Sequence, residues 1–352
     1  MKKIVMTGGG TAGHVTPNIA LFPYLKEAGY DIAYIGSYTG IEKQLIEDCG
    51  IKYYGISSGK LRRYFDWKNF TDPFRVIKGY FEAKKLIKEL KPDAVFSKGG
   101  FVSVPVVMAA SKCHVPAIIH ESDMTPGLAN KLAIPHATKV CCSFAETMQY
   151  LPAGKAVHTG SPIRKELFSG DKTSGLNFCG FTSDKPVILI MGGSIGSRFI
   201  NNAVWESLDT LLADFQIAHL VGKGNINKDL ENKPGYKQFE YVSDQLNDIF
   251  AATDLIISRA GANSISEILA LKIPNILIPL SAAASRGDQI LNAASYEKQG
   301  FSTVLQEEDL TSDILINAVS DVYSRRDQIK NTMATSKLLN ANETIVNLIK
   351  SL

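Results

Sequence analysis

The sequence has few cysteines, no long apolar run and no strong excess of charge of either sign. Its five cysteines are an odd number, and no two of them have the spacing C-x-x-C. This pattern favours reduced, mostly buried thiols and the cytoplasm over a disulfide framework. A formal net charge of +3 gives no ground for expecting a nucleic-acid partner, and none is predicted.

The sequence also shows no segment with the pattern of a membrane span or of a signal peptide. No apolar run approaches the roughly 18 to 20 residues that span a bilayer, and residues 1–7 lead directly into a glycine-rich loop without the pattern of a signal peptide. The pattern D-x-D does not occur, which weakens any case for a metal-held diphosphate. If this protein meets a membrane, we expect it to do so from one side.

What is present is a regular alternation of strands and helices over 352 residues. Short apolar runs such as 3–7, 93–97 and 115–120 are typical of buried parallel strands, and each leads into a glycine-rich or polar stretch. The pattern restarts at residues 186–197 with another strand and glycine loop. The alternation predicts an α/β fold made of two Rossmann-like domains that face one another across a cleft.

The domain boundaries follow from this restart. Residues 1–163 are predicted to form the first domain and residues 164–335 the second. Residues 336–352 are predicted to form a C-terminal helix, for which packing back on the first domain is an open alternative. The stretch 169–185 is polar and lacks a clear period, and we interpret it as the connection between the domains.

The first glycine loop, residues 8–14, formally satisfies the dinucleotide pattern G-x-G-x-x-G. That pattern also requires an acidic residue at the end of the second strand. Here that strand ends in Gly-Ser-Tyr at residues 36–38. A nicotinamide site is therefore rejected.

The densest group of polar residues at strand ends lies in residues 258–292. Two apolar runs of this region each lead into a loop and a helical pattern, so both loops emerge at the same edge of a parallel sheet. The helix start near residues 262–264 offers free amides to an anion, most simply a diphosphate. Glu267, about one turn later, is placed to accept both hydroxyls of a ribose. The alternative is a capping box, in which Ser264 and Glu267 only tie off the helix start.

One segment breaks the alternation. Residues 59–81 mix basic and aromatic side chains at high density, among them Arg62, Arg63, Phe65 and Trp67. This composition suits docking at an anionic lipid surface, where rings enter the interface and basic groups meet the headgroups. The alternative is a loop and helix whose aromatic rings pack inward while the charges are solvated.

Eight motifs occur in order along nearly the whole chain, at residues 8–17, 98–101, 120–121, 160–164, 192–196, 258–261, 266–267 and 288–292. Each motif is weak alone, but together they resemble the MurG family, the UDP-N-acetylglucosamine:N-acetylmuramyl-(pentapeptide) pyrophosphoryl-undecaprenol N-acetylglucosaminyltransferases of bacterial wall synthesis. The resemblance implies the two-domain glycosyltransferase fold known as GT-B. It also implies an inverting transfer to the 4-hydroxyl of the lipid-linked muramyl pentapeptide, lipid I, to give lipid II. No essential metal or other cofactor is implied.

The same resemblance implies a role for individual residues toward UDP-N-acetylglucosamine, most of them in the second domain. Those matched to the diphosphate, the donor, the uracil and the sugar hydroxyls are, in that order, Ser194, Arg164, Val242 and Gln289. Those matched to the run from the diphosphate to the ribose are Ala262, Asn263, Ser264, Ile265, Ser266 and Glu267. Those matched to the loop of the first domain that faces the donor sugar are Thr11, Ala12 and Gly13.

A base should remove the proton of the attacking hydroxyl. His14 is the first candidate, because it follows the first glycine loop; the alternative is that it only braces that loop. Glu121 is the second candidate. Where the family commonly has an asparagine three residues after its histidine, this chain has Asp123. Its added charge leaves two roles open, contact with the donor or a contribution to proton removal.

The lipid-linked acceptor favours membrane docking for residues 59–81, which predicts a peripheral protein at the anionic cytoplasmic face of the cell membrane. Two alternatives remain for the function. A UDP-N-acetylglucosamine 2-epimerase would share the architecture and the donor site but would need no lipid acceptor. A non-catalytic protein would bind the UDP-sugar without turnover.

Overall fold

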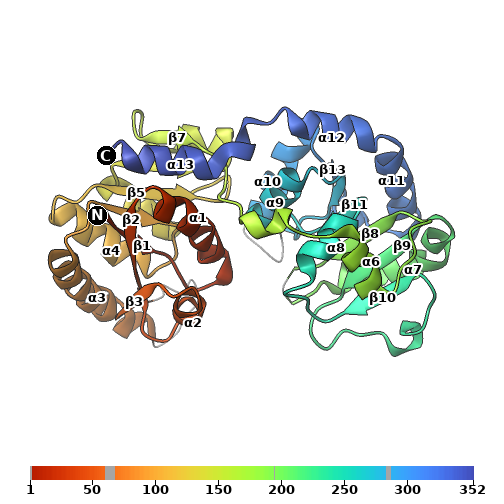
Figure 1. Cartoon of the computed structure of the whole chain (residues 1–352), viewed down its shortest axis with the longest axis horizontal. Coiled ribbons are helices and arrows are strands. Elements are labelled where there is room, and N and C mark those ends of the chain that lie inside the picture. Colours follow the sequence, from red (N-terminus) through yellow and green to blue (C-terminus); the bar gives the residue numbers. More distant parts are fainter. Residues whose placement is uncertain (1, 60–67, 194, 283–286) are drawn as a thin grey trace. The chain divides into compact units, whose positions relative to one another are not determined.

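The computed structural model describes the backbone of residues 2–59, 68–193, 195–282 and 287–352, and the side chains of all of these except 68–73. The chain divides into two compact units, Met1–Arg164 with Asn340–Leu352, which we call unit 1, and Lys165–Leu339, which we call unit 2. Each unit is built on a parallel sheet covered by helices (Figure 1). The prediction of two Rossmann-like α/β domains is confirmed.

Within the described residues, the sheet of unit 1 has seven parallel strands in the order β3-β2-β1-β4-β5-β6-β7. They are β1 Lys2–Thr7, β2 Tyr30–Ser37, β3 Lys52–Ile56, β4 Ala94–Ser97, β5 Ala117–Glu121, β6 Lys139–Cys142 and β7 Ala156–His158. The strand order reverses between β1 and β4. At such a reversal the loops diverge and leave room for a ligand at the carboxyl ends of the strands.

Helices cover both faces of this sheet. They are α1 Thr16–Glu27, α2 Ile41–Asp48, α3 Lys68–Leu90, α4 Ser103–Lys112, α5 Leu128–Ala133 and α13 Ala341–Lys350. Val5 of β1 belongs to the apolar core that α3 and α4 complete, whereas Ile4 and Met6 belong to the core that α1, α2 and α13 complete. Because both faces are buried, the strands are continuously apolar rather than alternating.

The C-terminal helix α13 packs against α1 of unit 1 (Figure 1). Its Ile345 and Ile349 lie in the same core as Leu21. At the start of the helix, the amide of Asn342 donates to the carbonyl oxygen of Ile163 at 2.7 Å and accepts the N–H of the same residue at 3.0 Å. The last helix is thus an integral part of the first sheet's cover.

Among the residues that the structure describes, the sheet of unit 2 has six parallel strands in the order β10-β9-β8-β11-β12-β13. They are β8 Val187–Met191, β9 Gln216–Leu220, β10 Tyr236–Phe239, β11 Leu255–Ser258, β12 Asn275–Leu277 and β13 Thr303–Val304. The helices are α6 Lys172–Cys179, α7 Arg198–Asp214, α8 Leu246–Ala252, α9 Ala262–Leu271, α10 Asp288–Lys298, α11 Ser312–Ser324 and α12 Arg326–Ala334. The order reverses between β8 and β11, as it does between β1 and β4 in unit 1.

The polar stretch 169–185, interpreted from the sequence as the connection between domains, contains a helix instead. Helix α6 begins after Asp171, whose side chain accepts the N–H of Ser174 at 2.7 Å, and it ends at Gly180 in the left-handed conformation. It packs against α8 within unit 2. The interpretation was wrong because a helix of eight residues has too few turns to show an apolar period.

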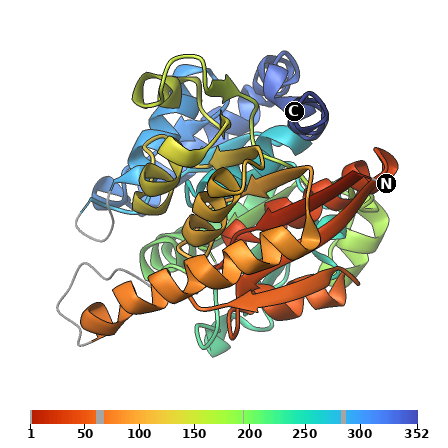
Figure 2. The ribbon, with the colours of Figure 1, turned by 90° about the vertical axis from the view of Figure 1, so that its left-hand side faces the viewer.

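Helix α3 contains the second part of the basic and aromatic segment 59–81 and continues to Leu90. It is a long helix at the surface of unit 1 (Figure 2). Its Ala83 and Ile87 enter the core, while Phe74, Ile77 and Phe81 are exposed by 72%, 54% and 62%. Residues three, four and seven apart share one side of a helix, so the three form an apolar stripe at the surface. The alternative in which the aromatic rings pack inward does not hold for Phe74 and Phe81.

We predict that α13 stabilises unit 1 through its buried face. Replacing Ile345 by alanine should lower the free energy of unfolding by about 2–5 kcal/mol, because the side chain is fully buried and the neighbouring helices close the gap only in part. Replacement of the exposed Asn347 by alanine is the matched control. Denaturant unfolding measures both, and equal stability of the two variants would contradict the prediction.

Candidate functional site

The residues predicted to bind or react lie mostly in loops at the carboxyl ends of the strands. In unit 1 these loops follow β1, β4 and β5, and in unit 2 they follow β8, β11 and β12. A parallel sheet brings such loops to one edge, next to the point where the strand order reverses. Each unit therefore presents one loop cluster, and the two clusters are described separately.

A buried carboxylate holds the first glycine loop of unit 1. Glu42 on α2 is fully buried and accepts the backbone N–H of Gly10 at 3.1 Å and of Ser37 at 3.0 Å. A Cβ on Gly100 would lie 2.2 Å from the carbonyl oxygen of Gly9, and Gly100 has a φ of +83°. Only glycine allows that approach and that backbone conformation. The loop after β1 is thus fixed against the loop after β4.

His14 ends a short 3₁₀ helix in the glycine loop, η1 (Ala12–His14). Its Nδ1 lies 3.1 Å from the carbonyl oxygen of Lys98. A carbonyl oxygen can only accept, so Nδ1 carries the proton and Nε2 keeps the lone pair. Burial lowers the pKa of His14, and the charge of Lys98 lowers it further. A neutral imidazole with a basic Nε2 is the form that can take up a proton near neutral pH.

Glu121 lies buried at the end of β5, and the loop that follows it engages its carboxylate. It accepts the N–H groups of Asp123 and Gly127, each at 3.0 Å, and the side-chain amide of Asn130 at 2.8 Å. Burial raises the pKa of Glu121, and the hydrogen bond from Asn130 opposes that shift. Because these contacts shape the loop, they favour His14 over Glu121 as the group that removes a proton.

Two buried residues of unit 1, to which the sequence pattern gives no separate role, lie beside these loops. The ammonium of Lys98 is 2.8 Å from Nδ1 of His120 and 2.7 Å from the hydroxyl of Ser122. Nε2 of His120 in turn donates to the carbonyl oxygen of Gly160 at 2.8 Å. Burial lowers the pKa of Lys98 to about 7 and that of His120 well below its usual range. A lysine is mostly a surface residue, so spacing alone gives no sign of this one.

The glycine loop of unit 2 crosses the end of β9 in tight contact. A Cβ on Gly196 would lie 2.0 Å from the carbonyl oxygen of Val221, and a Cβ on Gly222 would lie 2.4 Å from that of Ile195. Both glycines have a positive φ, +78° and +88°. Ser197 then caps α7 through its side chain. The first amides of α7 open at this loop, as an anion site requires.

Helix α9 begins at Ala262, directly after the loop that follows β11, and its N-cap is Gly261 without a side-chain cap. The alternative of a capping box formed by Ser264 and Glu267 is therefore wrong, because Ser264 already lies inside the first turn. Asn263, Ile265 and Ser266 belong to the same opening turns. Glu267 is half-buried in the second turn, one turn beyond the first amides of the helix.

Gln289 and Asn292 join α10 to the loops of unit 2. Oε1 of Gln289 accepts the N–H of Leu280 at 3.0 Å. The fully buried Asn292 donates from its amide to the carbonyl oxygen of Ala260 at 3.3 Å. These contacts fix the loops after β11 and β12. Val242 is buried shortly after β10, at the same edge of the sheet.

Arg259 organises the loops of unit 2, and its role is not visible in the sequence. Its guanidinium donates to the carbonyl oxygens of Ile278 at 3.2 Å and Pro279 at 3.1 Å, and to the hydroxyl of Ser197 at 2.6 Å. It also forms a buried ion pair with Glu307. A rigid, planar donor group suits such a junction. Through it the N-cap of α7 is tied to the loop after β12.

Some predicted residues lie outside the described part of the chain: Arg62, Arg63, Phe65, Trp67 and Ser194. Others lie at its surface or close to it: Thr11 and Ala12 are exposed, and Gly13, Asp123 and Arg164 are half-buried. Arg164 is the last residue of the first part of unit 1. The structure brings His14, Glu121 and Asp123 into one cluster in unit 1, and it brings residues 262–267 and Gln289 to one edge of unit 2.

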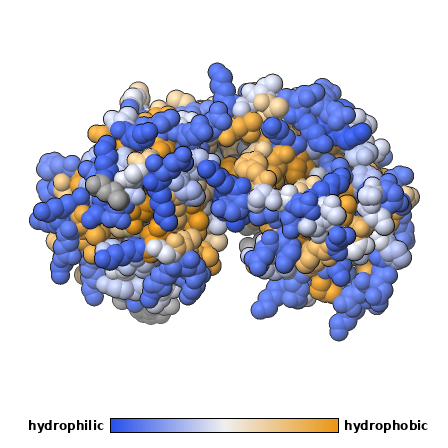
Figure 3. All heavy atoms as spheres, viewed as in Figure 1, coloured by the Kyte–Doolittle hydropathy of each residue, from blue (hydrophilic) through white to orange (hydrophobic). Residues whose placement is uncertain are grey.

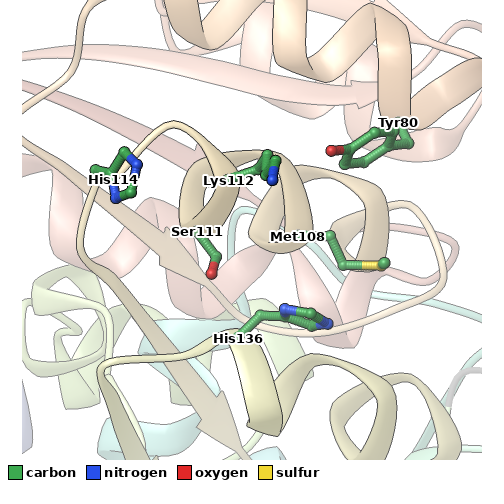
Figure 4. Close-up of a pocket in the computed structure, with 6 residues that line it drawn as sticks. All are labelled: Tyr80, Met108, Ser111, Lys112, His114 and His136. Carbon is green, nitrogen blue, oxygen red and sulfur yellow. The ribbon is translucent and has the colours of Figure 1, made fainter.

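A separate pocket of about 270 Å³ opens on unit 1 between α3, α4 and the 3₁₀ helix η2 (Ile134–His136) (Figure 4). It is lined by Tyr80, Met108, Ser111, Lys112, His114 and His136. Of the residues that the structure describes, neither candidate base and none of those matched to the donor lines it. The pocket instead adjoins the helix that carries the exposed apolar stripe.

Comparison with known proteins gives one consistent family. Two models match the chain, the N-terminal domain of glycosyltransferase family 28 over residues 4–142 and the C-terminal domain of the same family over residues 187–349. A relative from Lachnospira eligens, 63% identical over 350 residues and 99% of each chain, is named UDP-N-acetylglucosamine--N-acetylmuramyl-(pentapeptide) pyrophosphoryl-undecaprenol N-acetylglucosamine transferase.

Solved structures agree with this result. The structure of Acinetobacter baumannii MurG matches with a TM-score of 0.76 at 26% identity, over 100% of both chains. A UDP-GlcNAc 2-epimerase from Methanocaldococcus jannaschii matches with a TM-score of 0.70 at 14% identity, over 100% of both chains. The second likeness is one of fold alone. It shows that the architecture by itself does not separate transfer from epimerisation.

We predict that Arg259 and Glu307 stabilise unit 2 only as a pair. Replacing Arg259 by methionine should lower stability by about 3–5 kcal/mol, because it leaves the buried carboxylate of Glu307 without its cation. The double variant Arg259→Met, Glu307→Met removes both charges and should recover part of the loss. Thermal and denaturant unfolding measure both proteins. A double variant no more stable than the single one would contradict the prediction.

Proposed function

This chain belongs to glycosyltransferase family 28, and we propose that it transfers N-acetylglucosamine from UDP-N-acetylglucosamine to a lipid-linked N-acetylmuramyl pentapeptide. Relatives at 59 to 63% identity over 99% of the chain carry the name of that activity. The acceptor is undecaprenyl-diphospho-N-acetylmuramoyl-pentapeptide, lipid I, and the product is lipid II. No finding favours the epimerase or the non-catalytic alternative.

Unit 2 is proposed to hold the donor. The observation that carries this assignment is that α7 and α9 both begin at the carboxyl edge of its sheet, on either side of the reversal of strand order. Helix N-termini attract a diphosphate through their amides and dipoles. Glu267, one turn inside α9, is assigned to the ribose hydroxyls.

The remaining donor contacts follow the same order along the nucleotide. We assign Ser194 and the first turn of α9, residues 262–266, to the diphosphate and the sugar linkage, and Val242 to the uracil. Gln289 offers its amide nitrogen to a sugar hydroxyl, because Oε1 is engaged with Leu280. Arg164 is assigned to the donor, where its charge would offset that of the departing diphosphate.

The proposed chemistry is a direct displacement. The 4-hydroxyl of the muramyl sugar attacks the anomeric carbon, the bond from that carbon to the diphosphate breaks, and UDP leaves from the opposite face to give a β-1,4 linkage. The hydroxyl proton passes to Nε2 of His14. Such a base contributes about a hundred- to ten-thousand-fold to the rate. Amide dipoles at the diphosphate stabilise the charge that develops there.

Residues of the loops around His14 complete the assignment. Thr11, Ala12 and Gly13, at or near the surface, are assigned to the donor sugar. Asp123 is assigned an electrostatic role, because its charge raises the pKa of His14 and so increases the basicity of the imidazole. Glu121, held by its own loop, is the second candidate for the base.

The test of the function is a reaction with both substrates. The protein is incubated with UDP-N-acetylglucosamine and the lipid-linked muramyl pentapeptide, and the lipid is analysed by mass. A gain of one N-acetylglucosamine is expected. Conversion of UDP-N-acetylglucosamine alone to its 2-epimer would establish the epimerase instead, and binding without either product would establish a non-catalytic protein.

The donor assignment predicts a specific loss on changing Glu267 to glutamine. Affinity for UDP should fall by about ten- to a hundredfold, because a hydrogen bond to a charged group contributes about 1.5–3 kcal/mol. Titration calorimetry with UDP measures it. The exposed Glu308, changed in the same way, is the matched control. Equal affinity of the two variants would remove Glu267 from the site.

The lipid acceptor requires a membrane nearby, and we infer that unit 1 docks on its anionic cytoplasmic face. Among the residues described, no helix is long and apolar enough to cross a membrane. The exposed stripe of Phe74, Ile77 and Phe81 is accompanied by Arg75 and Lys78 on the same helix. Figure 3 shows apolar side chains at the surface of this unit among hydrophilic ones. Rings that enter the interface beside basic groups are typical of such docking.

The pocket beside α3 adds further groups to this surface. Lys112 and His114 are exposed at its rim, and His136 is half-buried. A cation and two imidazoles next to an apolar stripe suit the phosphate of a lipid headgroup. The stripe and the pocket are proposed as one docking surface. The same role is proposed for Arg62, Arg63, Phe65 and Trp67, which lie outside the described residues.

We predict that the double variant Phe74→Ser, Phe81→Ser binds vesicles of phosphatidylglycerol at least about tenfold more weakly, since each ring forgoes a burial that contributes about 1.5–3 kcal/mol. Replacing Arg62, Arg63 and Trp67 should weaken binding in the same assay. Phe168→Ser changes an exposed ring of unit 2 and is the control. Vesicle binding that matches the control in cosedimentation would refute the docking surface.

A further inference from the structure

The side chain of Lys98 is buried in a place where an apolar residue would be expected. It follows β4 directly and is 1% exposed. Its ammonium lies 2.8 Å from Nδ1 of His120, 2.7 Å from the hydroxyl of Ser122 and 3.5 Å from that of Ser161. A buried ammonium needs three acceptors for its three protons, and it has them here. Even so, removing the charge from water is unfavourable, so a gain in stability does not account for a lysine at this position.

These contacts join segments that carry the chemistry proposed for unit 1. Ser122 lies in the loop between Glu121 and Asp123, and Ser161 lies in the segment that ends at Arg164. The backbone of Lys98 adds a fourth link, because its carbonyl oxygen accepts the Nδ1 proton of His14 at 3.1 Å. A single residue therefore connects the base, the loop after β5 and the segment that carries Arg164.

The charged groups near Lys98 shift the pKa values of Lys98 and of His14. Burial lowers the pKa of Lys98 to about 7, and the nearby Glu121, Asp123 and Cys141 oppose that shift. Burial and the charge of Lys98 lower the pKa of His14. The hydrogen bond to the Lys98 carbonyl, Asp123 and Glu42 on α2 raise it. Burial is the main cause of the low pKa of His14, and the ammonium adds to it against the two carboxylates.

Unit 2 has a buried cation at the equivalent position. Lys98 follows β4, which pairs with β1, and Arg259 follows β11, which pairs with β8. In each sheet the strand order reverses between these two paired strands. The backbone N–H of Lys98 bonds to Thr7 at the end of β1, and that of Arg259 bonds to Met191 at the end of β8. Arg259 has its carboxylate partner, Glu307, whereas the described hydrogen bonds of the Lys98 ammonium go to an imidazole and two hydroxyls.

We propose that Lys98 is a positioning residue for sugar transfer, which acts through His14 and through the Ser122 and Ser161 hydroxyls and touches neither substrate. Its hydrogen bonds hold the loops on either side, and its charge assists burial in keeping His14 in the form that accepts a proton. The inference rests on the proposed function, in which His14 is the base.

The experiment compares Lys98→Met, Lys98→Gln and Lys98→Arg with the wild-type chain, using UDP-N-acetylglucosamine and an acceptor with a short prenyl chain. Lys98→Met should lower kcat by about tenfold, since small displacements of reacting groups have effects of that size. KM for UDP-N-acetylglucosamine, which is held by unit 2, should stay within about twofold. Lys131→Met removes an exposed charge from the same unit and is the control.

The pH profile of kcat/KM separates positioning from a structural role. Loss of the charge raises the pKa of His14, so the acid limb should move to higher pH by about half a unit in Lys98→Gln, and Lys98→Arg should restore it. Lys98→Gln introduced into the His14→Ala variant should not move the acid limb of the profile. If Lys98→Met does not fold, Lys98→Gln answers the question, because it keeps a hydrogen-bond donor and loses only the charge.

An unmoved acid limb in Lys98→Gln, or a loss of kcat that Lys98→Arg does not reverse, would overturn the inference while leaving the transferase activity in place. Failure of the proposed function looks different, because the wild-type chain itself would then form no lipid product. A His14→Ala protein that keeps the acid limb would remove the base on which the inference rests.

Discussion

A buried cation is stable in a protein only when its donors are all satisfied, and in both units this requirement fixes the loops at the edge of the sheet. Arg259 holds the N-cap of α7 and the loop after β12, and Lys98 holds the loop after β5. Since these contacts are buried, solvent does not weaken them as it weakens surface pairs. The backbone amides that open at the same edges are therefore set in place before any ligand arrives, which is the condition for electrostatic stabilisation of a charge that develops during reaction.

Hydrogen bonding also separates two kinds of polar residue in the loops: those that hold the loops in place and those proposed to take part in the reaction. Glu121 is a catalytic candidate in the sequence, yet it accepts several backbone and amide hydrogens and shapes a loop, as the buried Glu42 does. His14 differs, because one ring nitrogen is held by a carbonyl and the other keeps its lone pair. Glu267 lies inside α9, whose N-cap is Gly261, so it does not belong to a capping box at Ser264. The dense polar clusters thus contain few groups for chemistry and many that position them.

Much of the fold could be predicted from the sequence, because strands buried on both faces are continuously apolar and helices between them are periodic. The restart at residue 186 was enough to indicate a second domain of the same kind. Helix α6 was not predicted because it is short. The alternative of a capping box at Ser264 was wrong because a four-residue pattern does not fix where a helix begins. Most of the motif residues lie in loops at the carboxyl ends of the strands. The motifs gave no sign of the roles of Lys98 and Arg259, since burial of a charged side chain depends on contacts between strands far apart in the sequence.

The central proposal is that the donor diphosphate lies against the amides at the starts of α7 and α9 and that the ribose lies against Glu267. The most direct test is a crystal structure of the protein with UDP. The account predicts electron density for the diphosphate within hydrogen-bond distance of the backbone of residues 193–197 and of Ala262 or Asn263, with both ribose hydroxyls on the carboxylate of Glu267. A nucleotide bound elsewhere, or one whose diphosphate contacts neither helix start, would contradict it.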